Sequence, residues 1–273
     1  MLGSLDPSTF LYDPGMKIRC VDTFAGIGGF RLGAQAACMD LGLDFECVKS
    51  VEIDAKARET YFKNFQEEPD VDMTQIPAHS FPEHDLLLGG FPCQAFSRNG
   101  RWYNHNNRTI GDDDRANLVT YLLDVLEAKQ PAAFVFENVK EIMTILNGDK
   151  SSFFATLMDN LRSKGYEVSC SIMDSRGFGL PQQRKRCYFV GLREDIGVTP
   201  MLPLCDISTL KTSVEDILEP SVSPDLYLSV LWKNRMFAAQ NGRPLPEVLK
   251  YLRARPSLSP FVEKIEKSGL QQI

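Results

Sequence analysis

Short apolar strands alternate with helical segments over most of this 273-residue chain, and no other feature limits its fold as strongly. Strand patterns cover residues 18–22, 45–51, 85–88, 132–136, 167–173 and 186–190, and helical patterns cover 28–41, 55–65, 116–129 and 151–164. Strands joined through helices of this length form right-handed crossovers between parallel neighbours. The sequence therefore predicts an α/β fold, with a mainly parallel, doubly wound sheet that carries helices on both faces.

The pattern weakens after Arg193, where eight prolines interrupt the chain between Pro200 and Pro260. We expect one α/β domain at residues 1–195 and an irregular or helical C-terminal extension at residues 196–273. The net charge is −6, yet residues 233–267 hold eight Lys or Arg against three Glu. A basic tail thus follows an acidic body, and it either contacts phosphates or forms a solvated helical surface.

Cysteine and histidine usage excludes several classes of protein. The seven cysteines form no C-x-x-C pair, and the three histidines form no H-E-x-x-H motif, so we expect no metal site and no disulfide framework. Cys20, Cys47, Cys170 and Cys187 lie in apolar strands, which is typical of inert thiols. No apolar stretch approaches the roughly 18 residues of a membrane span. We expect a cytoplasmic protein without a membrane partner.

A glycine-rich turn, residues 22–30, closes the first strand and opens a helix, so backbone could pass close to a ligand at the helix N-terminus. The third glycine of a dinucleotide fingerprint would fall at position 31, where this chain has Arg31, and this disfavours a pyrophosphate site. Glu52 ends the second strand, where an acid can accept hydrogen bonds from ribose hydroxyls. Asp72 could cap an adenine edge. Taken singly, either acid could be no more than a solvated charge.

Cys93 differs from the other thiols because it follows a strand, a Gly-Gly turn and the rigid Pro92. This places it at the carboxyl edge of the sheet, where a thiolate can be exposed and activated as a nucleophile. Residues 94–114 then form a long aperiodic loop, typical of a lid or binding loop. Glu137-Asn138 follows another strand, and residues 182–186 precede the last. We expect a nucleophile, a carboxylic acid and an arginine to converge on one pocket.

At these residues the sequence resembles the cytosine-5 DNA methyltransferases of prokaryotic restriction-modification systems. The matching motifs, in family order, are Phe24-Ala25-Gly26-x-Gly28-Gly29, Gly90-Phe91-Pro92-Cys93-Gln94, Glu137-Asn138-Val139 and Gln182-x-Arg184-x-Arg186. A helix motif around Arg115 also fits, although Ala116 stands where glycine is usual. The resemblance covers residues 18–192. It implies a Rossmann-like fold that uses S-adenosylmethionine, and residues 1–195 as the catalytic domain.

The resemblance also implies roles for individual residues. The implied cofactor-binding residues are Phe24, Ala25, Gly26, Gly28, Gly29, Glu52, Ile53, Asp72 and Pro92, with Pro92 also helping to hold the target base. The implied substrate contacts, to double-stranded DNA, are Gln94, Ser97, Arg98 and Gln182. The implied catalytic residues are Cys93, Glu137, Arg184 and Arg186.

In the chemistry that the resemblance implies, the Cys93 thiolate adds to carbon 6 of a flipped-out cytosine, so that carbon 5 can attack the sulfonium methyl. Glu137 stabilises the ring at N3 and the exocyclic amine, Arg186 holds the carbonyl oxygen, and Arg184 supports the pocket. The loop at residues 94–114 closes over the base.

Two motifs that usually follow in the family, a ninth motif and a final Gly-Asn motif that completes the cofactor pocket, are not found in this chain. We therefore hypothesise either a fragment or the larger subunit of a split enzyme, whose second polypeptide carries DNA recognition and the final motifs.

Three other interpretations remain open. A transfer-RNA cytosine-5 methyltransferase shares the chemistry, although its usual Cys-Phe-Thr signature is not seen. A non-catalytic regulatory homologue would keep the fold, although it would have no need for Cys93, Glu137 and Arg186 together. A nicotinamide oxidoreductase would bind NAD at the glycine turn.

Overall fold

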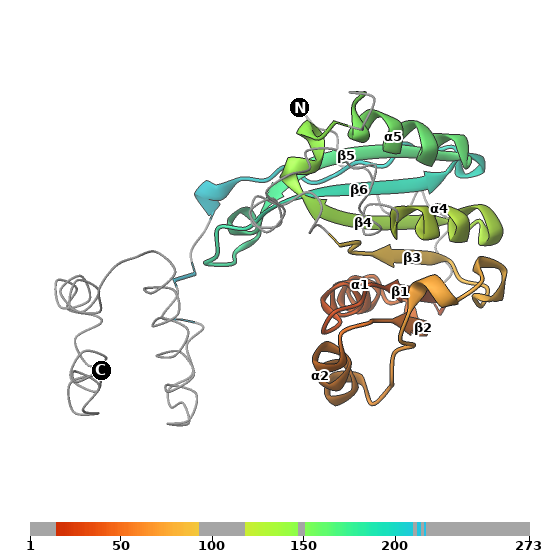
Figure 1. Cartoon of the computed structure of the whole chain (residues 1–273). Helices are drawn as coiled ribbons and strands as arrows, with labels where there is room; N and C mark the ends of the chain where they lie inside the picture. The colour runs from red at the N-terminus through yellow and green to blue at the C-terminus, as the bar shows by residue number, and fades with distance from the viewer. Residues whose placement is uncertain (1–14, 93–117, 147–150, 210–211, 214–215, 217–273) are drawn as a thin grey trace, which may run out of the picture. The chain divides into compact units, whose positions relative to one another are not determined.

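The computed structural model describes residues 15–92, 118–146, 151–209, 212–213 and 216 (Figure 1). The chain divides into two compact units, residues 1–212 and 213–273. Every helix and strand named below belongs to the first unit. Within the described ranges, no helix combines the length and the apolar character needed to cross a membrane.

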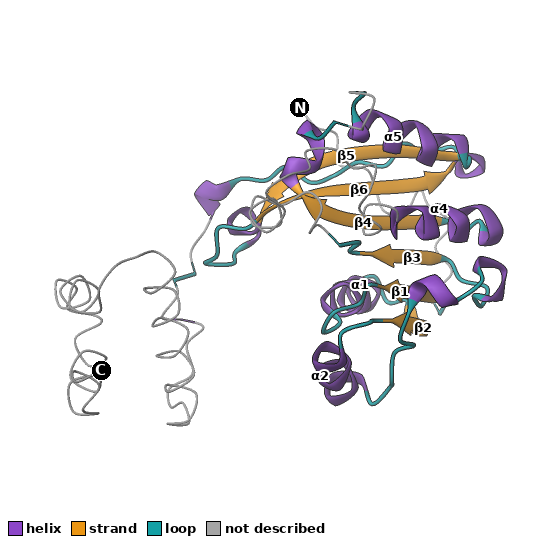
Figure 2. Cartoon of the chain, in the orientation of Figure 1, coloured by secondary structure: helices purple, strands orange, loops and turns teal. Residues whose placement is uncertain are grey.

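Six strands form one sheet in the order β2-β1-β3-β4-β6-β5 (Figure 2). Their bounds are β1 Lys17–Thr23, β2 Asp44–Val51, β3 Leu86–Gly89, β4 Ala133–Val139, β5 Tyr166–Asp174 and β6 Lys185–Arg193. The pairs β1·β2, β1·β3 and β3·β4 are parallel. The mainly parallel α/β sheet expected from the sequence is thus confirmed for the first four strands.

Strand β6 runs against its neighbours, because it pairs antiparallel with both β4 and β5. Its first residues therefore lie at the edge where β1, β3 and β4 end. Glu137 is registered opposite Tyr188, and Val139 opposite Arg186. Since alternate residues of a strand share a face, Glu137 and Arg186 lie on the same side of the sheet. This reversal brings the arginines at the start of β6 to the sheet edge where Glu137 lies.

Two of the four helices in the described residues begin at a side-chain cap. The bounds of the four helices are α1 Gly29–Asp40, α2 Ala55–Phe65, α4 Leu118–Lys129 and α5 Phe153–Ser163. Asp54 accepts a hydrogen bond from the Ala57 amide ahead of α2, and Ser152 accepts one from the Ala155 amide ahead of α5. The helix predicted at residues 116–129 is described from Leu118 onward.

The helices cover opposite faces of the sheet, as a doubly wound fold requires. Helix α1 packs on β1 and β2, and Phe30 of this helix meets the Tyr188 ring of β6 edge to face. On the other face, Leu122 of α4 and Phe136 of β4 both lie against Gly89. Beside them Phe134 stacks on Phe136, with ring centroids 4.5 Å apart. This aromatic layer forms the main core and holds the ends of β3 and β4 in place.

Past β6, the described residues up to Thr209 are irregular apart from two short 3-10 turns, as the proline-rich pattern suggested. Cys205 anchors this segment, because its thiol bonds to the backbone amide and carbonyl of Asp174, each at 3.3 Å. The domain limits at residues 195 and 196 remain a prediction. The basic segment 233–267 lies outside the described residues.

Candidate active site

The glycine turn between β1 and α1 has a conformation that few residues adopt. Phe24, Gly26 and Gly28 have φ angles of 51°, 56° and 92°, in the left-handed region. A Cβ on Gly28 would lie 2.1 Å from the Phe65 ring, so this position requires glycine for space as well as for backbone angle. Phe24 carries a side chain in the same region, which marks the turn as strained.

Glu52 connects this turn to the end of β2. One carboxylate oxygen accepts the Gly26 amide at 2.7 Å, and the other accepts the Asp54 amide at 2.8 Å. The sequence placed Glu52 near the turn, and the structure brings the two together. Each oxygen has a second lone pair, so bonds to a ligand hydroxyl remain possible.

The segment that carries Asp72 is joined to the end of β2 through Asp70. The Glu52 amide donates to the Asp70 carbonyl at 2.8 Å, and the Asp70 amide donates to the Ser50 carbonyl at 2.9 Å. One Asp72 oxygen caps the short turn η2, Met73–Gln75, by accepting from the amide and hydroxyl of Thr74. The sequence did not show this capping role.

The residues around the turn fit a nucleoside. A Cβ built on Gly26 or Gly29 meets nothing within 4 Å, so there is open space beside the turn. Ile53 leaves 66% of its surface exposed next to Glu52, which offers an apolar face for a base. Acceptors for hydroxyls, an apolar wall and close backbone are what a nucleoside-containing cofactor needs.

The second half of the site is a carboxylate held by two arginines. The Glu137 side chain, 19% exposed, accepts from Nε of Arg186 at 3.0 Å and lies 3.5 Å from Nη2 of Arg184. Burial raises the pKa of Glu137, although both arginines favour its charged form. A carboxyl group with a raised pKa keeps its proton to a higher pH than an ordinary glutamic acid and can deliver that proton to a reacting group. The expected meeting of Glu137 with the arginines is confirmed.

Asn138 links this cluster to the segment that leads toward Cys93. Its side chain is fully buried, donates to the Phe91 carbonyl at 3.3 Å and accepts from the Val139 amide at 2.8 Å. Pro92, half-buried, is the last described residue of that segment. The sequence assigned Asn138 no role of its own, although its place beside Glu137 was the available signal.

Glu137 and Asn138 lie inside β4 rather than after it, because this strand continues to Val139, where it still pairs with β6. Gln182 is exposed, and its carbonyl accepts from the Ser175 hydroxyl. The remaining predicted residues, Cys93, Gln94, Ser97, Arg98 and the loop at residues 94–114, lie outside the described residues.

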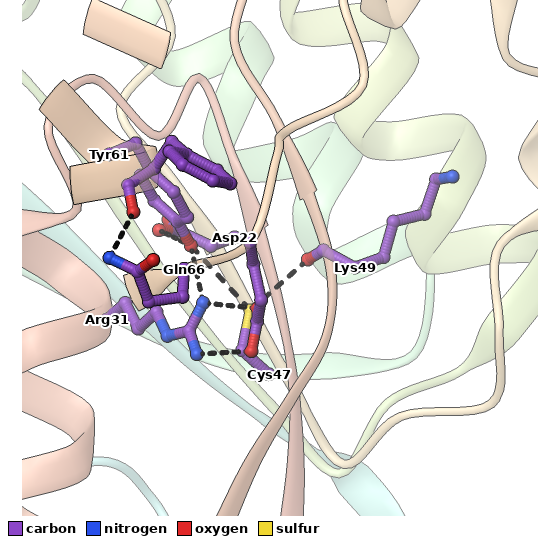
Figure 3. Close-up of polar contacts among 8 residues, drawn as sticks. Asp22, Arg31, Cys47, Lys49, Tyr61 and Gln66 are labelled. Carbon is purple, nitrogen blue, oxygen red and sulfur yellow. Dashed lines mark hydrogen bonds and ion pairs between the residues drawn. The ribbon is translucent and has the colours of Figure 1, made fainter. Parts of the chain in front are cut away.

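A buried polar cluster of Asp22, Arg31 and Tyr61 was not expected from the sequence (Figure 3). Asp22 of β1 is fully buried and accepts from the Tyr61 hydroxyl at 3.4 Å. Arg31, the residue that broke the dinucleotide fingerprint, is also buried and donates to the same hydroxyl at 3.2 Å. Burial raises the pKa of Asp22 to about 7. Through Tyr61 this cluster contacts the turn, because the Tyr61 ring lies 3.2 Å from where a Cβ on Gly28 would stand.

Curated bacterial relatives match most of this chain. The chain is 36% identical over 230 residues to the type II methyltransferase M.BsuFI of Bacillus subtilis, covering 84% of this chain and 53% of the relative. It is 44% identical over 189 residues to M.BanI of Aneurinibacillus aneurinilyticus, covering 69% and 41%. The chain is 41% identical to M1.ScrFI of Lactococcus lactis, and the match covers 77% of this chain and 51% of that relative. The chain spans about half the length of these relatives.

Solved structures confirm the fold. The Entamoeba histolytica methyltransferase EhMeth superposes with a TM-score of 0.57 at 22% identity, covering 76% of this chain and 61% of that one. The Dnmt2 methyltransferase of S. pombe superposes with a TM-score of 0.55 at 21% identity, covering 77% and 63%. A family model described as C-5 cytosine-specific DNA methylase matches residues 18–244. The chain therefore belongs to the C-5 cytosine-specific DNA methylase family.

Proposed function

We propose that this chain transfers a methyl group from S-adenosylmethionine to carbon 5 of a flipped-out cytosine in duplex DNA. The observation that carries the proposal is the Glu137 carboxyl, held by Arg184 and Arg186 and joined through Asn138 to the segment that enters Cys93. An acid and a guanidinium pair at this sheet edge, together with the thiol that follows Pro92 in the sequence, are the functional groups that covalent chemistry on a pyrimidine needs. Family membership supports the same reaction.

S-adenosylmethionine would supply an electrophilic methyl group. Glu52 would accept hydrogen bonds from its ribose, Asp72 would meet its adenine, and Ile53 would cover an apolar face. Phe24, Ala25, Gly26, Gly28 and Gly29 form the turn beside it, and Pro92 borders it near the target base. The open space at Gly26 and Gly29 supports this assignment.

The chain's own groups would act on the cytosine in sequence. The Cys93 thiolate forms a bond to carbon 6 while Glu137 gives or shares a proton at N3, so that no full charge builds on the ring. Arg186 holds the carbonyl oxygen, and Arg184 keeps the Glu137 carboxyl in place. Carbon 5 would then accept the methyl group, with S-adenosylhomocysteine as the leaving product. A base would remove the carbon 5 proton, the carbon 6 to sulfur bond would break to release the thiolate, and N3 would return its proton to Glu137.

Duplex DNA would be contacted by Gln94, Ser97, Arg98 and Gln182, because the target nucleotide must leave the helix before its ring can be attacked. The basic segment 233–267 would add phosphate contacts. We place the activity in the bacterial cytoplasm, in a restriction-modification setting like that of the type II relatives.

We further propose that sequence recognition and the final motifs are supplied from outside these residues, either by a second polypeptide or by the rest of a longer chain of which these residues are a fragment. This rests on the relatives, of which the chain spans 53%, 41% and 51%. Sequence-specific methylation of DNA by the isolated chain would contradict this part of the proposal and leave the catalytic part intact.

The covalent step can be tested with duplex DNA that carries 5-fluorocytosine, since fluorine at carbon 5 blocks the final elimination. We expect a stable protein–DNA adduct and transfer of labelled methyl from S-adenosylmethionine. Cys93→Ser should abolish both, whereas Cys38→Ser, at the far end of α1, should keep both. The assay is run with and without any polypeptide that co-purifies with the chain.

Other outcomes would point to other functions. Methylation of transfer RNA but not of duplex DNA would favour an RNA methyltransferase. Binding of S-adenosylmethionine without any adduct would favour a regulatory homologue. Affinity for NAD but not for S-adenosylmethionine would favour an oxidoreductase.

A further inference from the structure

The glycine turn packs against the C-terminal part of α2. The rings of Phe65 and Tyr61 occupy the space beside Gly28, at 2.1 Å and 3.2 Å from where a Cβ would stand. The Asn64 side chain donates to the Ile27 carbonyl at 3.0 Å. Two successive residues of the turn, Ile27 and Gly28, are therefore positioned by α2.

The Phe65 ring is itself held by Arg31. The guanidinium lies over this ring at 4.2 Å from its centroid, and the Tyr61 ring packs against Phe65 with centroids 4.6 Å apart. Stacking of a guanidinium on an aromatic face is attractive and fixes the ring's orientation. Arg31 follows Gly28 by about one helical turn in α1. Its side chain contacts the Phe65 ring, and that ring in turn lies against Gly28.

Glu67 keeps Arg31 in this position. Its two carboxylate oxygens accept from Nη1 and Nη2 of Arg31 at 2.6 Å and 2.9 Å, and the arginine side chain is only 10% exposed. A buried guanidinium that loses its carboxylate partner is strongly disfavoured, so it would turn toward solvent and leave the ring. Figure 3 shows Arg31 close to Tyr61, Asp22 and Cys47.

We propose that the Arg31–Glu67 ion pair is a positioning device for the cofactor turn. By holding the Phe65 ring against Gly28, the pair fixes the backbone conformation of the turn that faces the cofactor. Breaking the pair weakens cofactor binding and leaves the methyl-transfer step unchanged. The inference rests on the proposed function, because it takes the turn as the S-adenosylmethionine site.

The chain offers a matched control. Lys129 and Glu83 form a second pair of a largely buried cation, 12% exposed, with an exposed carboxylate at 2.9 Å. It joins α4 to the segment before β3 and contains no residue of the turn or its supports. Glu67→Gln and Glu83→Gln thus remove the same kind of charge from the same kind of pair.

The test measures binding of S-adenosylhomocysteine by calorimetry and exchange of the backbone amides at residues 24–31 by mass spectrometry. Glu67→Gln should weaken binding about tenfold and speed amide exchange in the turn. Glu67→Asp, which keeps the carboxylate, should recover part of the affinity and part of the protection from amide exchange. Glu83→Gln should match the unsubstituted chain. Under saturating S-adenosylmethionine, kcat of Glu67→Gln should stay within about twofold of the unsubstituted value.

Equal affinity and equal exchange in Glu67→Gln and Glu83→Gln would overturn the inference, because the pair would then serve stability alone. A fall in kcat with unchanged affinity would also overturn it. If the unsubstituted chain bound no S-adenosylhomocysteine, the assignment of the turn would fail first, and this inference with it.

Discussion

Glu137 illustrates how opposing influences set the chemistry of one side chain. Two arginines beside a carboxylate ordinarily lower its pKa, yet burial at the end of β4 outweighs them and the pKa is raised. The same arginines fix the orientation of the carboxyl group. Glu137 is therefore held in place without being forced into its charged form, as a group that gives a proton to a ring nitrogen should be.

This balance predicts a pH dependence for methyl transfer. The rate should fall as pH rises through the pKa of Glu137, because the proton that it donates is lost. Glu137→Gln should lower the rate by about 10² to 10⁴ and remove that dependence. Single-turnover rates across pH measure both effects. Glu167→Gln, on the exposed side of β5, should keep the profile of the unsubstituted chain. An unchanged profile in Glu137→Gln would show that another group titrates.

At the scale of elements, the ends of β3 and β4 are coupled through one side chain. Asn138 of β4 reaches the Phe91 carbonyl beyond β3, so the position of the segment entering Cys93 depends on where β4 ends. Because β4 continues to Val139, Asn138 is held by backbone pairing with β6 as well as by its own bonds. Strand pairing thus helps to position the nucleophile.

Asn138→Ala should therefore reduce activity more than it reduces stability. Loss of the bond leaves the Phe91 carbonyl without this partner, at a cost of about 1–3 kcal/mol. Displacement of Pro92 and Cys93 by even 1 Å should lower the rate by about 10². Tyr166→Phe removes another buried bond, from the Tyr166 hydroxyl to the Pro131 carbonyl at 2.9 Å, near the opposite end of β4. If the two variants have similar unfolding free energies but Asn138→Ala has the lower rate of methyl transfer, the coupling is supported. Equal rates of methyl transfer in the two variants would contradict it.

For the whole molecule, the buried cluster at Asp22 makes stability depend on pH. The pKa of Asp22 rises from 3.8 to about 7 in the folded chain, so the folded state binds more protons than the unfolded state between these values. The stability that this group contributes is present in full below about pH 4 and is lost as pH rises through about 7. Since one pKa unit corresponds to about 1.4 kcal/mol, the loss amounts to a few kcal/mol.

Asp22→Asn should remove this dependence, because an amide oxygen can still accept from Tyr61 but cannot ionise. Between pH 4 and pH 8, the variant should therefore gain a few kcal/mol on the unsubstituted chain, as measured by urea unfolding at several pH values. Asp124→Asn, at an exposed position on α4, should show no such gain. A constant difference between Asp22→Asn and the unsubstituted chain across pH would refute the prediction.

The sequence by itself determined the order of strands and helices, the glycine turn and the motif residues, because these depend on local periodicity, backbone angle and residue chemistry. Tertiary structure alone decided three further features. These are the reversed direction of β6 that brings Arg186 to Glu137, the bond from Asn138 to Phe91, and the Arg31–Glu67 pair. Each joins residues more than 30 positions apart, and which distant groups share buried space follows from packing rather than from local pattern.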